Sequence, residues 1–244
     1  AFAYISRNQS AEVLACATRA AEHWQDSTPR NKGIAILLRG LGHHLKKDYP
    51  AAIAAFREVV EIDRSISPES NDVAIDMNSL AEAERENKDY PAAERDYREA
   101  LRIAKINKND ELIADYTGNL AELALDRKQW AEAESLAREA LALAEKVGRQ
   151  ELIASDCHRL AYALLKQNPV DGVGATRPVQ KSALSGNVEA QENDLSDREG
   201  SSLHEALLLS RRAVEIFTRL RHPDLQSAQE TPAEIERALQ KSER

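Results

Sequence analysis

The chain has 244 residues, of which 30% are charged and only 5% are aromatic, and its formal net charge is −8. This acidic balance argues against a nucleic-acid-binding protein, because the affinity of such proteins comes from clustered Lys and Arg. No stretch comes near the roughly 18 apolar residues of a membrane-spanning helix, and residues 1–5 do not open a secretory signal. Together with two isolated cysteines, Cys16 and Cys157, these features predict a cytoplasmic protein.

A partial hairpin is expected at the start of the chain, over residues 1–28. Val13, Leu14, Ala17 and Trp24 follow the apolar spacing of the second helix in the hairpins that come after it. We therefore expect this sequence to be a fragment of a longer protein that begins inside a helical hairpin.

The chain then repeats a helical hairpin with a period of 39 or 40 residues. The pairs that mark the repeat are Leu41-Gly42, Leu80-Ala81, Leu120-Ala121 and Leu160-Ala161. An aromatic residue and an alanine follow each of the first three pairs: Tyr49 and Ala52, Tyr90 and Ala93, Trp130 and Ala133. A fixed period of this size is typical of stacked helical hairpins. The expected repeats cover residues 33–66, 68–107, 109–148 and 150–222.

Each repeat carries signals for two helices and for their close packing. Asp48 and Asp89 directly precede Tyr-Pro pairs and are candidate N-caps, since proline is tolerated in the first helical turn. Small residues such as Ala81 and Ala93 are expected where the two helices cross closely, because a larger side chain would overpack the crossing.

The fourth repeat is interrupted by an inserted segment, residues 168–202, which is rich in Gly, Pro, Ser, Asn and acidic residues. This composition predicts a long loop that is disordered. The apolar spacing of a helix resumes at Leu203. A C-terminal capping helix is expected over 231–242, because Thr231 and Glu234 form a capping box with Pro232 at the first helical position.

These patterns resemble the tetratricopeptide repeat (TPR) family. The likeness is carried by Asn78-Ser79-Leu80-Ala81, Gly118-Asn119-Leu120-Ala121 and Tyr97-Arg98-Glu99-Ala100-Leu101. A period longer than the usual ~34 residues is similar to the repeats of kinesin light chain and of the sensor arms of bacterial signalling ATPases. The resemblance implies an all-α fold, a right-handed α-solenoid of stacked antiparallel helical hairpins, that forms a single domain over residues 1–244. The chain departs from the family where an aromatic residue is usual in the first helix, at Leu45, Glu84, Ala124 and Leu164.

No catalytic constellation is visible in the sequence. His43-His44 and Asp156-Cys157-His158 are consecutive residues, which point about 100° apart on a helix and cannot form a triad among themselves. His204-Glu205 lacks the second histidine that a zinc-protease helix needs. We therefore predict a protein that is not an enzyme and that holds neither a cofactor nor a metal.

The resemblance implies a concave groove lined by the first helix of each hairpin. Residues three positions before and one position after the small residue of the repeat point into such a groove. With two of their neighbours they give the candidate ligand-binding residues: Arg39, His43, Asn78, Glu82, Arg85, Asn119, Glu122, His158 and Tyr162. Asparagine offers both a donor and an acceptor to a peptide backbone, and the glutamates favour a basic ligand.

A protein-binding module is the best interpretation of these features. It would be part of a larger scaffold or sensor protein and would hold a peptide or a partner helix in its groove, with no nucleic-acid or membrane partner. Two alternatives stay open: a self-assembly or autoinhibitory arm that acts within its parent protein and, more remotely, an RNA-binding helical repeat.

Overall fold

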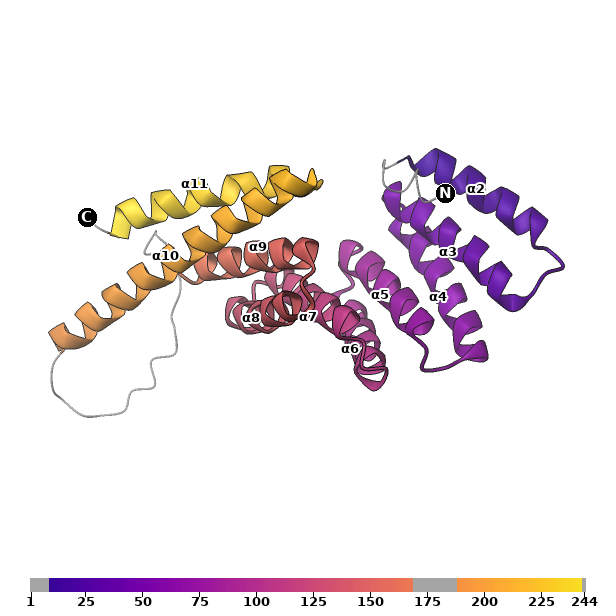
Figure 1. The fold of residues 1–244 in the computed structure, drawn as a ribbon, viewed down its shortest axis with the longest axis horizontal. Coiled ribbons are helices and arrows are strands. Elements are labelled where there is room, and N and C mark those ends of the chain that lie inside the picture. Colours follow the sequence, from indigo (N-terminus) through magenta and orange to yellow (C-terminus); the bar gives the residue numbers. More distant parts are fainter. Residues whose placement is uncertain (1–8, 169–187, 243–244) are drawn as a thin grey trace. The chain divides into compact units, whose positions relative to one another are not determined.

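The computed structural model describes residues 9–168 and 188–242, with side chains throughout except at 188–199 and 242. Every regular element in these ranges is a helix (Figure 1). The all-α class and the stacked antiparallel hairpins predicted from the sequence are confirmed. The chain falls into two compact units, residues 1–123 and 124–244.

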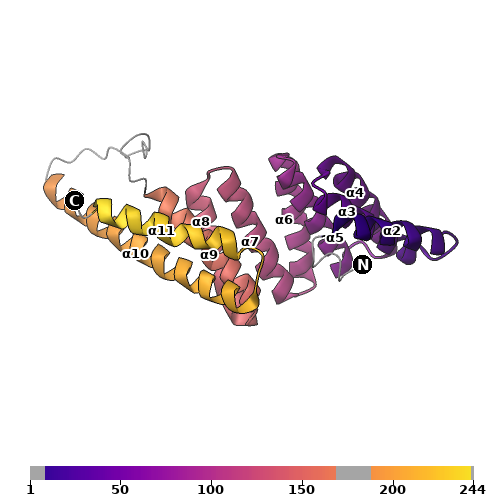
Figure 2. The ribbon, with the colours of Figure 1, turned by 90° about the horizontal axis from the view of Figure 1, so that it is seen from above.

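The first unit contains hairpins built from consecutive helices. Its helices are α2 (Ser10–His23), α3 (Pro29–Leu45), α4 (Tyr49–Ile66), α5 (Asn71–Glu86), α6 (Tyr90–Ile106) and most of α7 (Asp110–Asp126). Helices α3 and α4 form one hairpin, and α5 and α6 form the next. Helix α2 packs against α3, and α4 packs against α5, as can be followed in Figure 2.

Aspartate side chains start the second helices of these hairpins. Asp48 Oδ1 accepts a hydrogen bond of 3.4 Å from the backbone N–H of Ala51. Asp89 Oδ1 accepts an equivalent bond of 3.3 Å from Ala92. Both predicted N-caps are therefore confirmed, and each satisfies a backbone donor that the first helical turn leaves without a partner.

Small residues allow the helices of the first unit to approach closely. Ala52, Ala81 and Ala93 have no exposed surface. Gly42 of α3 faces α2, and a Cβ atom built on it would lie only 2.7 Å from Leu14 Cγ. Glycine at this position therefore permits the contact between α2 and α3.

The second unit holds the end of α7 and the helices that follow it. These are α8 (Trp130–Val147), α9 (Gln150–Gln167), α10 (Val188–Leu220) and α11 (Leu225–Ser242). Helix α9 packs against α8 and α10, and α10 packs against α11. Arg138 of α8 donates to both carboxylate oxygens of Glu205 on α10, at 2.6 and 2.8 Å. This bidentate pair ties α10 to α8 although an inserted segment separates α9 from α10 in the sequence.

The predicted loop 168–202 is wrong over its second part. Helix α10 begins at Val188, so residues 188–202 are helical. Their sequence includes Glu189-Ala190-Gln191-Glu192, all strong helix formers, which outweigh the polar composition that suggested a loop. Residues 169–187 of the predicted loop lie outside the described residues.

The predicted start of the last helix is also wrong. Helix α11 begins at Leu225 and contains Pro232 in its interior, whereas a first helical turn at Thr231 and Pro232 was predicted. Ala228 and Ile235 have no exposed surface. Burial of this apolar stripe on both sides of the proline outweighs the cost of an interior proline, which is about 3 kcal/mol.

Candidate functional site

Most of the candidate ligand-binding residues lie on the first helices of the hairpins in the first unit. Arg39 and His43 are on α3, Asn78, Glu82 and Arg85 are on α5, and Asn119 and Glu122 are on α7. Arg39 forms an ion pair with Glu58 of α4, and His43 Nδ1 lies 3.4 Å from Asp48 Oδ2. These two side chains are therefore held within the hairpin formed by α3 and α4.

The structure brings two of the candidates into direct contact. Asn119 Nδ2 donates a hydrogen bond of 3.0 Å to Asn78 Oδ1, which joins α7 to α5. Both asparagines are half-buried. Glu82, one turn after Asn78, is exposed, and Glu122 is half-buried. Helices α5 and α7 thus each present an amide and a carboxylate within one turn.

The remaining candidates, His158 and Tyr162, lie on α9 in the second unit. The Tyr162 ring meets the Trp130 ring edge-on, with the ring centroids 6.4 Å apart. Lys166 Nζ lies 4.8 Å from the centroid of the Tyr162 ring. Tyr162 therefore takes part in the packing of α9 against α8, and it belongs to the rim of a small hydrophobic cluster.

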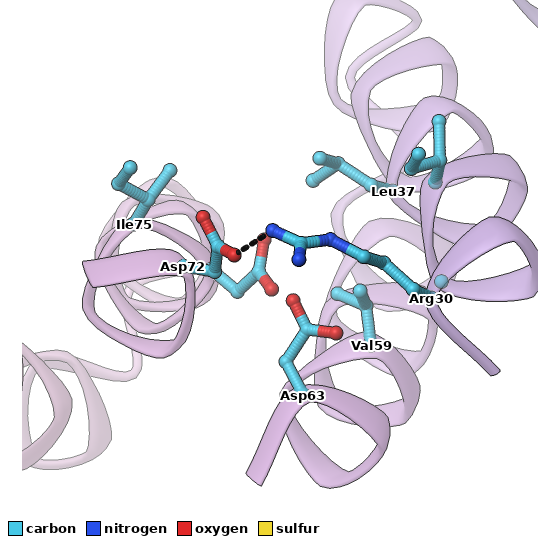
Figure 3. Close-up of a pocket in the computed structure, with 9 residues that line it drawn as sticks. Arg30, Leu37, Val59, Asp63, Asp72 and Ile75 are labelled. Carbon is cyan, nitrogen blue, oxygen red and sulfur yellow. Dashed lines mark hydrogen bonds and ion pairs between the residues drawn. The ribbon is translucent and has the colours of Figure 1, made fainter. Parts of the chain in front are cut away.

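A cleft that was not predicted from the sequence lies between α3 and α5, next to the end of α4 (Figure 3). Its volume is about 310 Å³. The lining combines apolar side chains with one arginine and three aspartates: Arg30, Gly33, Ile34, Leu37, Val59, Asp63, Asp72, Ile75 and Asp76. Arg30 of α3 and Asp72 of α5 form an ion pair of 2.7 Å across the cleft.

Asp76 is the most deeply buried acid of this cleft. Only 3% of its surface is exposed, and its Oδ2 atom has no hydrogen-bond partner among the described residues. Burial, together with the carboxylates of Asp63 and Asp72, raises the pKa of Asp76 to about 8. The cleft therefore concentrates acidic groups that a single lining arginine, Arg30, offsets.

One signal in the sequence could have revealed Asp76. It falls on the apolar stripe of its helix, three residues after Val73 and four before Leu80, where a charged residue is unusual. The equivalent positions of the other repeats hold Leu37, Tyr116 and Asp156. Tyr116 and Asp156 are each only 1% exposed. This repeat position therefore faces the protein interior, and an acid there needs a specific explanation.

Glu84 is a second buried acid, and its Oε1 atom is paired, while Oε2 has no hydrogen-bond partner among the described residues. It has no exposed surface and accepts a hydrogen bond of 2.7 Å from Arg57 Nη2 of α4. Its neighbour Asp96 on α6 accepts two bonds from Arg95, at 2.8 and 3.0 Å. Burial raises the pKa of Glu84 to about 7 in spite of Arg57. This network connects α4, α5 and α6, and its role is structural.

The Cys157 thiol, in another polar motif of the sequence, is buried in the structure. Burial raises the pKa of the Cys157 thiol to about 11, whereas an activated cysteine has a lowered pKa. Within residues 9–168 and 200–241, no group of three or more His, Cys, Asp or Glu side chains is placed to hold a metal ion. None of the helices that the structure describes is long and apolar enough to cross a membrane.

Comparison with known proteins gives one family match and several similar folds. The tetratricopeptide repeat family matches residues 33–106 and 71–146. No curated protein matches the sequence. A putative kinesin light chain from Podosopora anserina, with nearly identical TPR-like repeats, is 15% identical with a TM-score of 0.59, over 89% of this chain and 91% of its own. BtubC (BKLC) from P. vanneervenii is 16% identical with a TM-score of 0.57, over 98% of this chain and 89% of its own. At these identities the likeness is one of fold.

Proposed function

We propose that this chain, whose residues 33–146 are tetratricopeptide repeats, is a protein-interaction module that binds a peptide or a partner helix along the first helices of its hairpins. The family match and the similar solved structures bear out the predicted resemblance to TPRs of the kinesin light chain type. Stacked helical repeats of this kind work through an extended surface rather than through a closed catalytic pocket.

The observation that carries the proposal is the pair of amides formed by Asn78 and Asn119. Their hydrogen bond of 3.0 Å holds two half-buried side chains together on α5 and α7. Asn78 uses its oxygen in this bond, which leaves its Nδ2 group to donate to a carbonyl of the ligand. A side chain that is already held in place loses less entropy on binding than a mobile one. The pair is therefore suited to recognise a peptide backbone.

The charges near these amides support a basic ligand. The exposed carboxylate of Glu82 lies one turn after Asn78 on α5. Complementary charge selects among partners and speeds association more than it raises affinity. A peptide that carries Lys or Arg beside the segment that meets Asn78 is the ligand we expect.

Selection from a displayed library of random peptides tests this proposal. The full chain serves as bait, in parallel with an Asn78→Ala, Asn119→Ala variant and with a Lys105→Ala control. The Lys105 side chain is exposed and lies on a second helix, α6. We expect wild type and control to enrich the same peptides. The double variant should bind them about fivefold more weakly, because the lost hydrogen bond from Asn78 Nδ2 contributes about 1 kcal/mol.

Two results would contradict the proposal. Equal affinity of wild type and double variant, both with the same helix content by circular dichroism, would exclude the amide pair as the binding site. A wild-type chain that selects no peptide and forms dimers in analytical ultracentrifugation would favour the self-assembly alternative.

A further inference from the structure

The cleft between α3 and α5 has apolar walls that can hold an alkyl chain. Ile34 of α3 and Ile75 of α5 line it and remain 41% and 43% exposed. Figure 3 shows Leu37 and Val59 on one side and Ile75 on the other, with the carboxyl groups of Asp63 and Asp72 between them. The cleft therefore offers apolar surface next to its acidic groups.

The acidic groups of the cleft have fewer donors than they need. Arg30 is already paired with Asp72. Among the described residues, the Asp76 Oδ2 atom is buried and has no hydrogen-bond partner. Leaving a buried polar atom without a partner is costly, and such atoms are uncommon in folded proteins. The carboxyl groups of Asp76 and Asp63 share a hydrogen bond, which keeps a proton between the two acids. Among the described residues, no donor reaches the remaining oxygen, Asp76 Oδ2.

We propose that this cleft receives a basic side chain, Lys or Arg, of the bound peptide, with its alkyl stem against Ile34 and Ile75 and its cationic group on Asp63 and Asp76. The inference rests on the proposed function, because this side chain belongs to the peptide ligand. It names the feature by which the module recognises that ligand.

The chemistry of the cleft selects this occupant over others. An anion is repelled by the aspartates, and a purely apolar side chain leaves Asp76 Oδ2 without a donor. No group of acids among the described residues is arranged to hold a metal ion. Ile75 also precedes Asn78 by three residues, which places both on one face of α5. A peptide bound at the paired amides can therefore reach the cleft with one of its side chains.

A proton competes with the basic side chain for Asp76. Burial raises the pKa of this carboxyl to about 8, and it is surrounded by Asp63 of α4, by Asp72 with its partner Arg30, and by the buried phenol of Tyr116 on α7. A cation that binds there displaces the proton. The affinity for the basic side chain should therefore rise as the pH rises toward 8.

A small cation tests the cleft without a peptide. The full chain, labelled at the Ile, Leu and Val methyl groups, is titrated with n-butylguanidinium and with n-butylurea, a neutral molecule of nearly the same shape, and is followed by NMR. We expect n-butylguanidinium to shift the methyl signals of Ile34, Leu37, Val59 and Ile75, and n-butylurea to leave them unchanged. An Asp63→Asn, Asp76→Asn variant should lose the shifts, whereas Glu61→Gln, on the exposed face of α4, should keep them.

The results separate this inference from the proposed function. Equal shifts with both probes, no shift with n-butylguanidinium, or shifts that persist in the Asp63→Asn, Asp76→Asn variant would overturn the inference. Peptides from the library provide the second measurement. We expect them to share a Lys or Arg at one position, and to bind the same variant about ten- to a hundredfold more weakly, as for the loss of a charged hydrogen bond.

Library peptides without a shared basic residue, bound equally by wild type and by the Asp63→Asn, Asp76→Asn variant, would overturn the inference and leave the proposed function intact. Shifts with n-butylguanidinium, in a chain that binds no peptide, would instead support the cation site and contradict the proposed function.

Discussion

Asn119 of α7 donates a hydrogen bond to Asn78 of α5, so that two side chains expected to bind a ligand are already each other's partners. The bond spans 41 residues of sequence and connects the first helices of consecutive repeats. The pair therefore has a structural role in addition to the proposed binding role, and the two roles can be separated by mutation.

Asn78→Asp should separate them. An aspartate keeps the Oδ1 atom that accepts from Asn119, but it removes the Nδ2 donor that we assign to the ligand backbone. We expect the free energy of unfolding in urea to change by less than about 1 kcal/mol, and the affinity for a library peptide to fall in fluorescence polarisation. The added negative charge by itself favours a basic peptide, so the affinities are compared at high salt, where this attraction is screened. An unchanged affinity there would show that this donor makes no contact with the ligand.

The pair of Arg57 and Glu84 gives a second prediction. Arg57→Ala should lower the free energy of unfolding by about 1–3 kcal/mol, because it leaves the buried Glu84 without its donor. Glu84→Leu should be neutral or stabilising by up to about 4 kcal/mol, since an apolar side chain avoids the cost of burying the charge. In Glu84→Leu the Arg57 side chain, which is already 58% exposed, can turn to the solvent and does not become a buried charge without a partner. Urea unfolding of both variants at neutral pH measures these changes. A Glu84→Leu variant that is less stable than Arg57→Ala would contradict the prediction.

The hairpins were predictable from the sequence because their determinants are local and repeated. Asp48 and Asp89 cap helices a few residues away, and the alanines at the crossings recur with the period of the repeat. A helix-start signal that does not recur with the repeat gave a wrong prediction. Thr231 and Pro232 form a good helix start by local rules, yet the buried stripe on both sides of them continues the helix.

The cleft between α3 and α5 could not be predicted from local or repeated sequence patterns. Its lining comes from three helices, and Arg30, Asp63 and Asp76 are far apart in the sequence. No spacing rule links an arginine in a first turn to an aspartate two helices later. The candidate residues on the first helices followed from the resemblance, but the pattern did not show that Asn78 and Asn119 would bond to each other.

Alanine substitutions at Gly42 and Gly33 of α3 should change the free energy of unfolding in opposite directions. A Cβ atom at Gly42 would lie 2.7 Å from Leu14 Cγ, whereas one at Gly33 would have ordinary contacts of 3.5 to 3.6 Å. Gly42→Ala should therefore lower the free energy of unfolding by about 1–3 kcal/mol through overpacking. Gly33→Ala should raise it by about 0.5–1 kcal/mol, because alanine is the better helix former. Thermal and urea unfolding measure both, and a stabilising Gly42→Ala would show that α2 moves away at no cost.

Asp76 should make the stability of the first unit depend on pH. Its pKa is about 8 in the folded protein and near the usual value of about 3.9 in the unfolded chain. Between these values the folded state binds the proton more tightly. Its contribution to stability is therefore complete below about pH 4 and is lost progressively as the pH rises to about 8.

Asp76→Asn isolates this contribution, because the amide stays neutral throughout the range. We expect the free energy of unfolding of wild type to fall between about pH 5 and about pH 8, and that of Asp76→Asn to fall less. Some dependence should remain, since burial also raises the pKa of Glu84, to about 7, and acts in the same direction. Urea unfolding at both pH values, with Glu61→Gln as the exposed control, measures the difference. Parallel pH profiles for wild type and Asp76→Asn would mean that the pKa of Asp76 is not raised in the folded protein.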